Sequence, residues 1–376
     1  KMKILHFIMG KANPNRPNGV NYVIHGLCKY FSKQGHDVKV IGLSKGMKDK
    51  YELAKRENFK VDVYNKFFGE CFNTLKKEIE KCDIVHLHSV WQHQNIILGR
   101  YLKSINKPYV VTIHSGLTED RIKQSNYYTK LLYHKLFQKY IFDNASGIHA
   151  ITREEISDIS KYTVNKNIFF VPNGVDTQQY KLKEKSYEFD NNINKKYRFG
   201  YLGRFGEEKN IKNLILAINN LSGNIKKSIE CVLIGPIDKD AKKLQELTKK
   251  LNLDEVIIFT GPLYNEEKLE KLGNLDFYIH PAYSDVVSIA AMEAMACGLP
   301  LVITRTSQIS YYYNSGSFLM MEPTENEIRK TILEMLENKS NWNEMSKSSI
   351  KNVEDFFNWD NVVKMMTKEY ERILND

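Results

Sequence analysis

Two carboxylates stand eight positions apart in a stretch of mostly small or apolar residues, SDVVSIAAMEAMACGLP at residues 284–300. Burying Asp285 and Glu293 in such surroundings is costly unless something pairs with each acid. A carboxylate can accept hydrogen bonds from two hydroxyls at once, which suits the vicinal diol of a ribose or a hexose. The alternative is a helix-capping aspartate and a buried, ion-paired glutamate.

The same stretch predicts a helix that begins near Ser288 and ends at Gly298, because Gly298 and Pro300 together form a helix stop. Backbone N–H groups at a helix start have no intrahelical partner and lie at the positive end of the helix dipole. We therefore expect the amides of Val286, Val287 and Ser288 to form a phosphate site.

A second candidate site is GRFGEEKN at residues 203–210, which follows a strand-like segment and precedes a helix-like one. Such a loop presents free amides from Gly203 onward, and Arg204 and Lys209 place two cations beside them. Arginine can bind two phosphate oxygens at once and lysine adds a mobile point charge, so the loop suits a diphosphate. The alternative is a solvated loop in which Glu207 and Glu208 balance the cations.

Strand-like and helix-like segments alternate along the chain, which is typical of βαβ units and a parallel sheet. In the first half the predicted strands are 3–9, 36–43, 83–89, 109–116, 147–152 and 167–176, with a helix from 20 to 35. In the second half the predicted strands are 198–205, 230–235, 256–261, 276–282 and 300–304, with helices at 212–221 and 242–251. The tail from Asn326 is predicted to be helical, with one break near Asn358 and Trp359.

Residues 181–197 are polar, charged and rich in asparagine, so they are the best candidate for a linker. The chain is therefore predicted to be an α/β protein of two facing Rossmann-like domains. In this class of fold, ligands bind at the carboxyl ends of the strands.

The charge of the chain is unevenly distributed. The 376 residues carry a formal net charge of +10, and residues 1–180 hold 28 Lys and Arg against 16 Asp and Glu. This basic half indicates an anionic partner, which could be a membrane surface, a phosphate-bearing substrate or nucleic acid. A general solubility feature is the alternative, and we expect no nucleic-acid binding, because the basic residues are dispersed and no RNA or DNA module is recognisable.

No apolar run is long enough to span a membrane, and the N-terminal KMKILHFIMG turns polar too soon for a signal peptide. Five scattered cysteines without a CxxC pair indicate reduced thiols. We therefore expect a cytoplasmic protein.

Taken together, these segments resemble the retaining glycosyltransferases of family 4, which have the GT-B fold. The two acids resemble the family's E-x7-E signature, and GYLGRFGEEKNIKNLILAI resembles the strand–loop–helix that opens its C-terminal domain. FVPNGVDTQQY, GHDVKVI, DIVHLHS, VVTIHSG and MEAMACGLPLVIT are similar to further family segments and occur in the family's order. The resemblance implies an acceptor-binding domain at 1–180, a linker at 181–197, a nucleotide-sugar-binding domain at 198–356, and a helix at 359–376 that crosses back onto the first domain.

The resemblance also implies roles for individual residues. Arg204 and Lys209 would neutralise the donor's diphosphate as the sugar leaves, Glu293 would hold the ribose hydroxyls, and Asp285 would contact the transferred sugar. The first acid of the signature is Asp here rather than Glu. That change shortens the acid at the pocket for the transferred sugar.

Further implied contacts lie in the first domain. Gly19 would let backbone approach the donor or acceptor closely, and His114 would contact the sugar or acceptor. The chain departs from the family where Asn18 precedes Gly19 in place of a Gly-Gly pair, and where Val286 and Val287 replace glycines.

The implied activity is the transfer of a sugar, in the manner of a hexosyltransferase, from a nucleotide-diphosphate sugar to a hydroxyl. UDP-sugars are the most common donors, and the acceptor would be a glycan, a lipid-linked or a protein-linked molecule. We see no DxD carboxylate pair of the kind that metal-dependent enzymes use, so we expect a metal-independent reaction without a cofactor. The rival interpretations are a nucleotide-sugar epimerase of the same fold and a non-catalytic glycosyltransferase-like subunit. The high Lys, Asn and Ile content favours bacterial surface polysaccharide or glycoconjugate assembly.

Histidines 86, 88 and 93 lie close together in sequence and raise the question of a metal site. His86 and His88 alternate on a strand with no acid in good register, so we favour one of them facing the cleft over a metal site. The alternative for each is a hydrogen-bonded, half-buried histidine.

Residues 119–142 are predicted to form a long helix with an apolar stripe at Tyr128, Leu132, Leu136 and Tyr140, flanked by lysines. The favoured interpretation is a helix that packs this stripe on its own sheet. The alternative is peripheral contact with an anionic membrane, which would place the protein at the inner face of the membrane.

Overall fold

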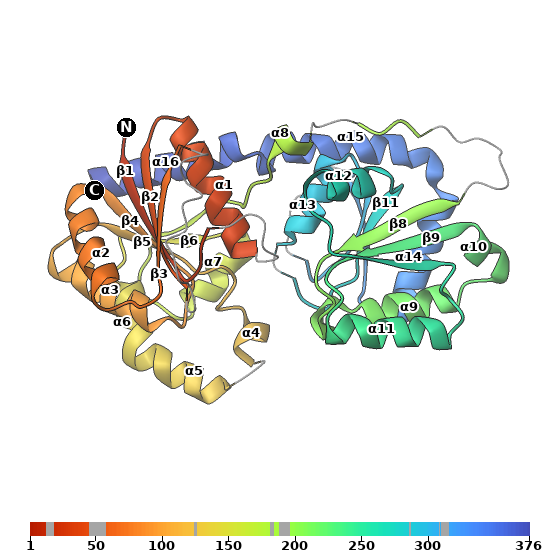
Figure 1. Cartoon of the computed structure of the whole chain (residues 1–376), viewed down its shortest axis with the longest axis horizontal. Helices are drawn as coiled ribbons and strands as arrows, with labels where there is room; N and C mark the ends of the chain where they lie inside the picture. The colour runs from red at the N-terminus through yellow and green to blue at the C-terminus, as the bar shows by residue number, and fades with distance from the viewer. Residues whose placement is uncertain are drawn as a thin grey trace. The chain divides into compact units, whose positions relative to one another are not determined.

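The computed structural model describes residues 1–12, 19–44, 58–123, 126–180, 184–187, 196–285, 287–307, 309 and 316–376. The chain divides into two compact units, Lys1–Gly174 with Trp359–Asp376, and Val175–Asn358. Each unit is built on one parallel sheet flanked by helices (Figure 1). Most of the expected linker, together with Asn18 and Val286, lies outside the described residues.

The first unit contains a seven-stranded sheet in the order β3-β2-β1-β4-β5-β6-β7. Its strands are β1 (Lys3–Ile8), β2 (Asp37–Leu43), β3 (Lys60–Tyr64), β4 (Ile84–His88), β5 (Tyr109–Thr112), β6 (Gly147–Ala150) and β7 (Ile168–Phe170). Its helices are α1 (Gly19–Lys33), α2 (Glu70–Lys81), α3 (His93–Ser104), α4 (Glu119–Lys123), α5 (Tyr127–Tyr133), the π-helix η2 (His134–Gln138), α6 (Lys139–Asp143), α7 (Arg153–Ser160) and α16 (Trp359–Asn375). The strand order reverses between β1 and β4, which is where open α/β sheets bind ligands.

The second unit contains a six-stranded sheet in the order β10-β9-β8-β11-β12-β13. Its strands are β8 (Tyr197–Leu202), β9 (Ile229–Ile234), β10 (Ile257–Gly261), β11 (Phe277–His280), β12 (Leu301–Thr304) and β13 (Phe318–Met321). Its helical segments are α8 (Thr177–Tyr180), η3 (Glu207–Lys209), α9 (Ile211–Asn219), α10 (Gly223–Lys227), α11 (Lys239–Lys250), α12 (Asn265–Gly273), α13 (Ile289–Ala296), α14 (Glu325–Glu337), η5 (Lys339–Asn341), α15 (Trp342–Asn352) and η6 (Val353–Phe357). Here the strand order reverses between β8 and β11.

Both faces of the second sheet are buried, as its near-continuous apolar strands require. On β9, Cys231 and Leu233 belong to the core cluster on one face, whereas Val232 and Ile234 belong to the cluster on the other. The sheet is therefore the middle layer of the unit and its strand ends are the parts open to ligands.

The C-terminal helix α16 completes the first unit. Trp359 is 1% exposed, and its ring fills space that two glycines leave open. A Cβ atom on Gly26 would lie 2.3 Å from the Trp359 ring, and one on Gly174 would lie 2.4 Å from it. Both positions therefore exclude any larger residue unless the tryptophan moves.

The α/β class predicted from the sequence is confirmed, with both sheets entirely parallel in their paired strands. The predictions missed β3 and β13, which are short strands at sheet edges. The tail also breaks at Asn338, between α14 and η5, as well as at Asn358. Within the described part of the chain, no helix combines the length and apolar character needed to cross a membrane.

The single long helix predicted over residues 119–142 is wrong. Asn126 has left-handed backbone angles, with φ 51° and ψ 39°, directly before α5, so α4 and α5 are separate helices. The helix from Tyr127 to Asp143 is then interrupted by the π-helical turn η2. Its apolar stripe is exposed rather than packed on the sheet, so the favoured interpretation of that stripe is also wrong.

Candidate functional site

The loops after β8 and β11 meet in the second unit, at the point where the strand order reverses. The Nζ atom of Lys209 lies 2.8 Å from Oδ2 of Asp285, so the two sequence motifs are joined by an ion pair. The side chains of Lys209 and Asp285 are only 17% and 13% exposed. This pair lies where the fold class places its ligands.

A third residue, His280 at the end of β11, completes the pair. Its Nε2 atom lies 2.8 Å from the same Asp285 oxygen, and its Nδ1 atom lies 3.3 Å from the Tyr278 hydroxyl. Burial alone would raise the pKa of Asp285, but the hydrogen bonds and charges of His280 and Lys209 outweigh it and hold that pKa well below its usual range. Asp285 is therefore a carboxylate at neutral pH. Both contacts use Oδ2, so within the described part of the chain Oδ1 is the oxygen left for a ligand hydroxyl.

The loop after β8 is held in place by conformations that few residues adopt. Gly203 has φ 153°, and a Cβ atom there would lie 2.5 Å from the Tyr201 hydroxyl. Asn210 has a left-handed backbone before α9, and its side-chain amide donates to the carbonyls of Pro281 and Pro323. Glycine and asparagine are the residues that tolerate such backbone angles, and Asn210 ties this loop to the one after β11.

Arg204 occupies the same loop but is not held in it. Its side chain is 64% exposed, and its Nη2 atom lies 3.8 Å from Glu208, which is a weak surface pair. The balancing of charge by Glu208, considered from the sequence as the alternative, is therefore observed for Arg204. The guanidinium can leave this pair at little cost.

The helix predicted at residues 288–298 is confirmed as α13, with Ser288 as its N-cap. The Ser288 hydroxyl accepts from the Ala291 amide at 3.1 Å, and Gly298 ends the segment with φ 72°. Val287 precedes the cap, and Val286 lies outside the described residues. The first turn of α13 therefore begins directly after the loop that carries Asp285.

Glu293 lies in α13 and is paired, as the alternative interpretation of the sequence anticipated. Its Oε1 atom accepts from Nζ of Lys268 on α12 at 2.8 Å, with the two side chains 7% and 17% exposed. The Lys268 ammonium also lies 5.7 Å from the centre of the Tyr180 ring. Within the described residues Lys268 is the partner of Oε1, and no protein group contacts Oε2.

Gly19 and His114 both belong to the first unit. Gly19 is exposed and begins α1, directly after residues that lie outside the description. His114 follows β5 with a left-handed φ of 49°, and its Nε2 atom lies 3.1 Å from Nδ1 of His88. Burial lowers the pKa of His114 to about 3, so its imidazole is neutral at pH 7.

His114 is the outer end of a polar row that crosses the first sheet. His6, His88 and His114 are linked ring to ring, with His6 Nδ1 2.9 Å from His88 Nε2. A second chain runs from the Tyr370 hydroxyl through His86 and Thr112 to His149. His149 Nε2 donates to the Val171 carbonyl at 2.8 Å, which fixes the direction of every hydrogen bond in that second chain.

This row is a hydrogen-bonded network whose geometry does not suit a metal ion. Ligating atoms of His6, His86 and His88 do lie within 4.8 Å of one another. However, the rings of His86 and His88 are stacked at 4.2 Å with 22° between their planes, so their lone pairs cannot converge on one ion. Both side chains are buried, at 0% and 2% exposure, and hydrogen-bonded, which is nearer to the interpretation as hydrogen-bonded histidines than to a residue that faces a cleft. His93, on the surface, pairs with the Tyr133 hydroxyl.

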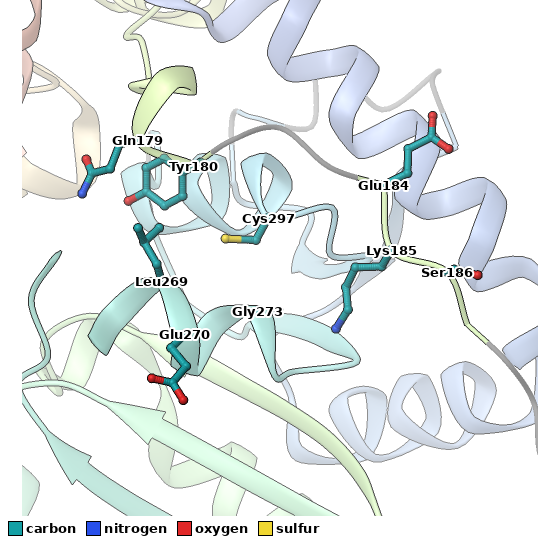
Figure 2. Close-up of a pocket in the computed structure, with 9 residues that line it drawn as sticks. All are labelled: Gln179, Tyr180, Glu184, Lys185, Ser186, Leu269, Glu270, Gly273 and Cys297. Carbon is teal, nitrogen blue, oxygen red and sulfur yellow. The ribbon is translucent and has the colours of Figure 1, made fainter. Parts of the chain in front are cut away.

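A separate pocket of about 620 Å³ lies in the second unit among α8, α12 and the end of α13 (Figure 2). Its lining residues include none of the charged residues of the two motifs, such as Lys209, Asp285 and Glu293. Cys297 faces this pocket, and burial raises the pKa of its thiol to about 12, so it is not a nucleophile. Lys185 also lines it and donates to the Leu275 carbonyl. We assign no chemistry to this pocket.

Sequence reasoning missed three residues of the site, namely His280, Asn210 and Lys268. A histidine before a proline at a strand end and an asparagine before a helix are both weak signals in a single sequence. Lys268 belongs to a helix, α12, that was not predicted, and only the folded sheet brings it to Glu293.

Comparison with known proteins covers nearly the whole chain. Residues 17–179 match the family described as Glycosyltransferase Family 4, and residues 183–354 match the one described as Glycosyl transferases group 1. An uncharacterized glycosyltransferase of Methanocaldococcus jannaschii, MJ1069, is 25% identical over 288 residues, which are 74% of this chain and 72% of that protein. TuaC of Bacillus subtilis (strain 168), whose name refers to teichuronic acid biosynthesis, is 23% identical over 279 residues, 72% of this chain and 65% of TuaC.

The fold is shared with solved structures. HepE from Anabaena in complex with UDP superposes with a TM-score of 0.79 at 15% identity, covering 99% of this chain and 100% of HepE. The same protein in complex with UDP-glucose superposes with a TM-score of 0.78.

Proposed function

This chain belongs to family 4 of the retaining glycosyltransferases, which have the GT-B fold and use nucleotide sugars, and we propose that it transfers a hexose from a UDP-sugar to a hydroxyl acceptor. The observation that carries this proposal is the Lys209–Asp285–His280 cluster at the carboxyl ends of β8 and β11. In this cluster Lys209 is a cation that can bind a phosphate, and Asp285 is an acid that can bind a sugar hydroxyl. The UDP and UDP-glucose in HepE support the choice of donor.

The second unit is the proposed donor site. Lys209, the exposed Arg204 and the amides of Val287 and Ser288 surround the diphosphate, and the glycine at 203 lets the backbone come close to it. As the bond between sugar and phosphate breaks, negative charge grows on the leaving diphosphate, and these groups stabilise it. The departing phosphate then helps to take the proton from the acceptor hydroxyl. In this scheme protein cations do the neutralising, so EDTA should leave turnover unchanged.

The two acids divide the recognition of the donor. Glu293 keeps Oε1 on Lys268 and offers Oε2 to the ribose diol, while Asp285 offers Oδ1 to the transferred sugar. Asp285 is one methylene shorter than the family's glutamate. Because His280 and Lys209 both bind its Oδ2 atom, they fix where its Oδ1 atom points. His280 is therefore a positioning residue for the sugar.

The first unit is the proposed acceptor side, through Gly19 and His114. A neutral His114, held by His88, donates or accepts one hydrogen bond without carrying charge. We propose a glycan, lipid-linked or protein-linked acceptor, in assembly of a bacterial surface polysaccharide or glycoconjugate in the cytoplasm. The name of TuaC supports this pathway.

A thermal-shift panel tests the proposal directly. The full chain is melted with UDP, GDP and ADP, and with the corresponding sugar nucleotides, at about 100 times the dissociation constant. UDP and a UDP-sugar should raise the stability by about 2.7 kcal/mol. Stabilisation by GDP or ADP alone would correct the base, and no shift with any of the compounds would overturn the donor site.

A further inference from the structure

The segment formed by α5, η2 and α6 presents apolar side chains to solvent. Tyr128, Leu132 and Leu136 are 83%, 58% and 55% exposed, and no described residue of α5 is buried. In Figure 1, α5 lies at the edge of the first unit, away from its sheet. We call the exposed set the apolar face, and its members are Tyr127, Tyr128, Leu132, Leu136, Phe137 and Tyr140.

The inward side of the same segment is polar, so its amphipathic character is inverted. His134 and Gln138 are only 6% and 4% exposed. The Gln138 side-chain oxygen accepts from the Trp91 amide at 2.7 Å, and the His134 ring packs against Phe142 and Tyr162. These contacts fix the rotation of the helix and hold the apolar face outward.

Cations lie on the same segment as the apolar face and beside it. Lys130, Lys135 and Lys139 lie on the same segment, and the Arg100 guanidinium lies 5.6 Å from the centre of the Tyr140 ring. The acidic residue within Tyr127–Asp143 is Asp143, which is already engaged by Lys139 and Thr163. The segment therefore carries cations together with its exposed apolar side chains.

We propose that the apolar face docks in the plane of an anionic lipid bilayer and thereby holds the first unit on the membrane surface. Tyrosine, leucine and phenylalanine enter the boundary between headgroups and acyl chains, and lysine and arginine bind the acidic headgroups. That the docked unit meets a lipid-linked acceptor rests on the proposed function, whereas the docking itself does not.

Vesicle flotation tests the proposal with the full-length chain. The vesicles contain phosphatidylcholine alone or phosphatidylcholine with about one third phosphatidylglycerol. Lys130, Lys135 and Arg100, each worth about fivefold at an anionic surface, should together raise binding to the anionic vesicles by on the order of 10²-fold at low salt. High salt should remove most of that difference.

The test variant is Leu132→Ser with Leu136→Ser, and the matched control is Val164→Ser with Met365→Ser. All four side chains are exposed, at 58%, 55%, 66% and 40%, so neither variant should disturb folding. The test variant should lose about tenfold or more in vesicle binding, because two leucines no longer enter the interface. The control should bind as the wild type does.

Three results would overturn the proposal. The first is that the wild type does not bind anionic vesicles, and the second is that the test variant binds them as well as the wild type does. The third is that the wild type forms a dimer in light scattering, that the test variant does not, and that neither binds vesicles. The last result would assign the face to a second copy of the chain. The thermal shift with UDP is measured on the same samples, so loss of docking with nucleotide binding retained separates this proposal from the proposed function.

Discussion

Replacing Lys209 with methionine separates the structural from the catalytic role of the ion pair. In the Lys209→Met variant, His280 is the remaining partner of the Asp285 carboxylate among the described residues, and that side chain is 13% exposed in the wild type. Removing one partner of a buried ion pair costs about 3–5 kcal/mol, and the slight exposure places this pair at or below the lower limit. We expect a loss of about 2–3 kcal/mol in the free energy of unfolding, and a melting temperature lower by roughly 5–10 °C.

The same change should lower turnover by about 10²-fold, the magnitude typical of losing one transition-state donor. The double variant Lys209→Met with Asp285→Asn removes the unpaired charge, so its stability should return to within about 1 kcal/mol of the wild type. Its turnover should stay low, because the cation is still missing. Calorimetric melting gives the stability, and release of nucleoside diphosphate from the best-binding nucleotide sugar gives the turnover.

The reasoning would be refuted by near-normal turnover in the folded Lys209→Met protein, because the lysine would then have no part in neutralising the diphosphate. It would also be refuted if the double variant recovered both properties together. An unchanged melting temperature in the single variant would show that Asp285 does not depend on this partner.

Three further predictions concern the other groups. In calorimetry, His280→Leu should weaken binding of the sugar nucleotide by about tenfold and leave binding of UDP unaffected. His280→Gln keeps a hydrogen-bond donor, so it should restore part of the lost affinity. An equal loss of affinity for UDP would contradict a role in positioning the sugar. Glu293→Gln should weaken UDP by about 10- to 100-fold but hardly change 2′-deoxy-UDP, and parallel losses would exclude the ribose contact. Burial lowers the pKa of His6 to about 3 and of His149 to about 4, below the unfolded value near 6.5, so the unfolded chain binds protons first and stability falls as pH drops below about 6.5. Each such histidine contributes about 1.4 kcal/mol per pH unit in that window, so denaturant titrations should show a shallower pH dependence of stability for His6→Leu than for the wild type.

Local patterns predicted most elements of the fold. The run KILHFIM predicts a strand at 3–9, and β1 spans Lys3–Ile8. The small residues after Ser288 and the glycine at 298 predict α13 at both ends. These signals depend on residues that are neighbours in sequence, so the sequence alone is enough to predict these elements.

The partners of the site residues could not be predicted in the same way. Lys268 meets Glu293, and His280 meets Asp285, because separate strands and helices bring them together. Periodicity likewise identified the stripe at Leu132 and Leu136 but not the side it faces. That side is set by Gln138, whose partner Trp91 is distant in sequence.

The burial of Trp359 between Gly26 and Gly174 bears on the order in which the chain can fold during synthesis. The ribosome completes every strand and helix of the second unit before it adds α16, so that unit can mature first. The first unit emerges earlier yet must wait, with a hollow beside Gly26, until residues 359–376 arrive to close it. A polypeptide that ends at Gly174 would therefore leave the space beside Gly26 permanently open. During synthesis, chaperones would encounter the first unit before α16 has completed it.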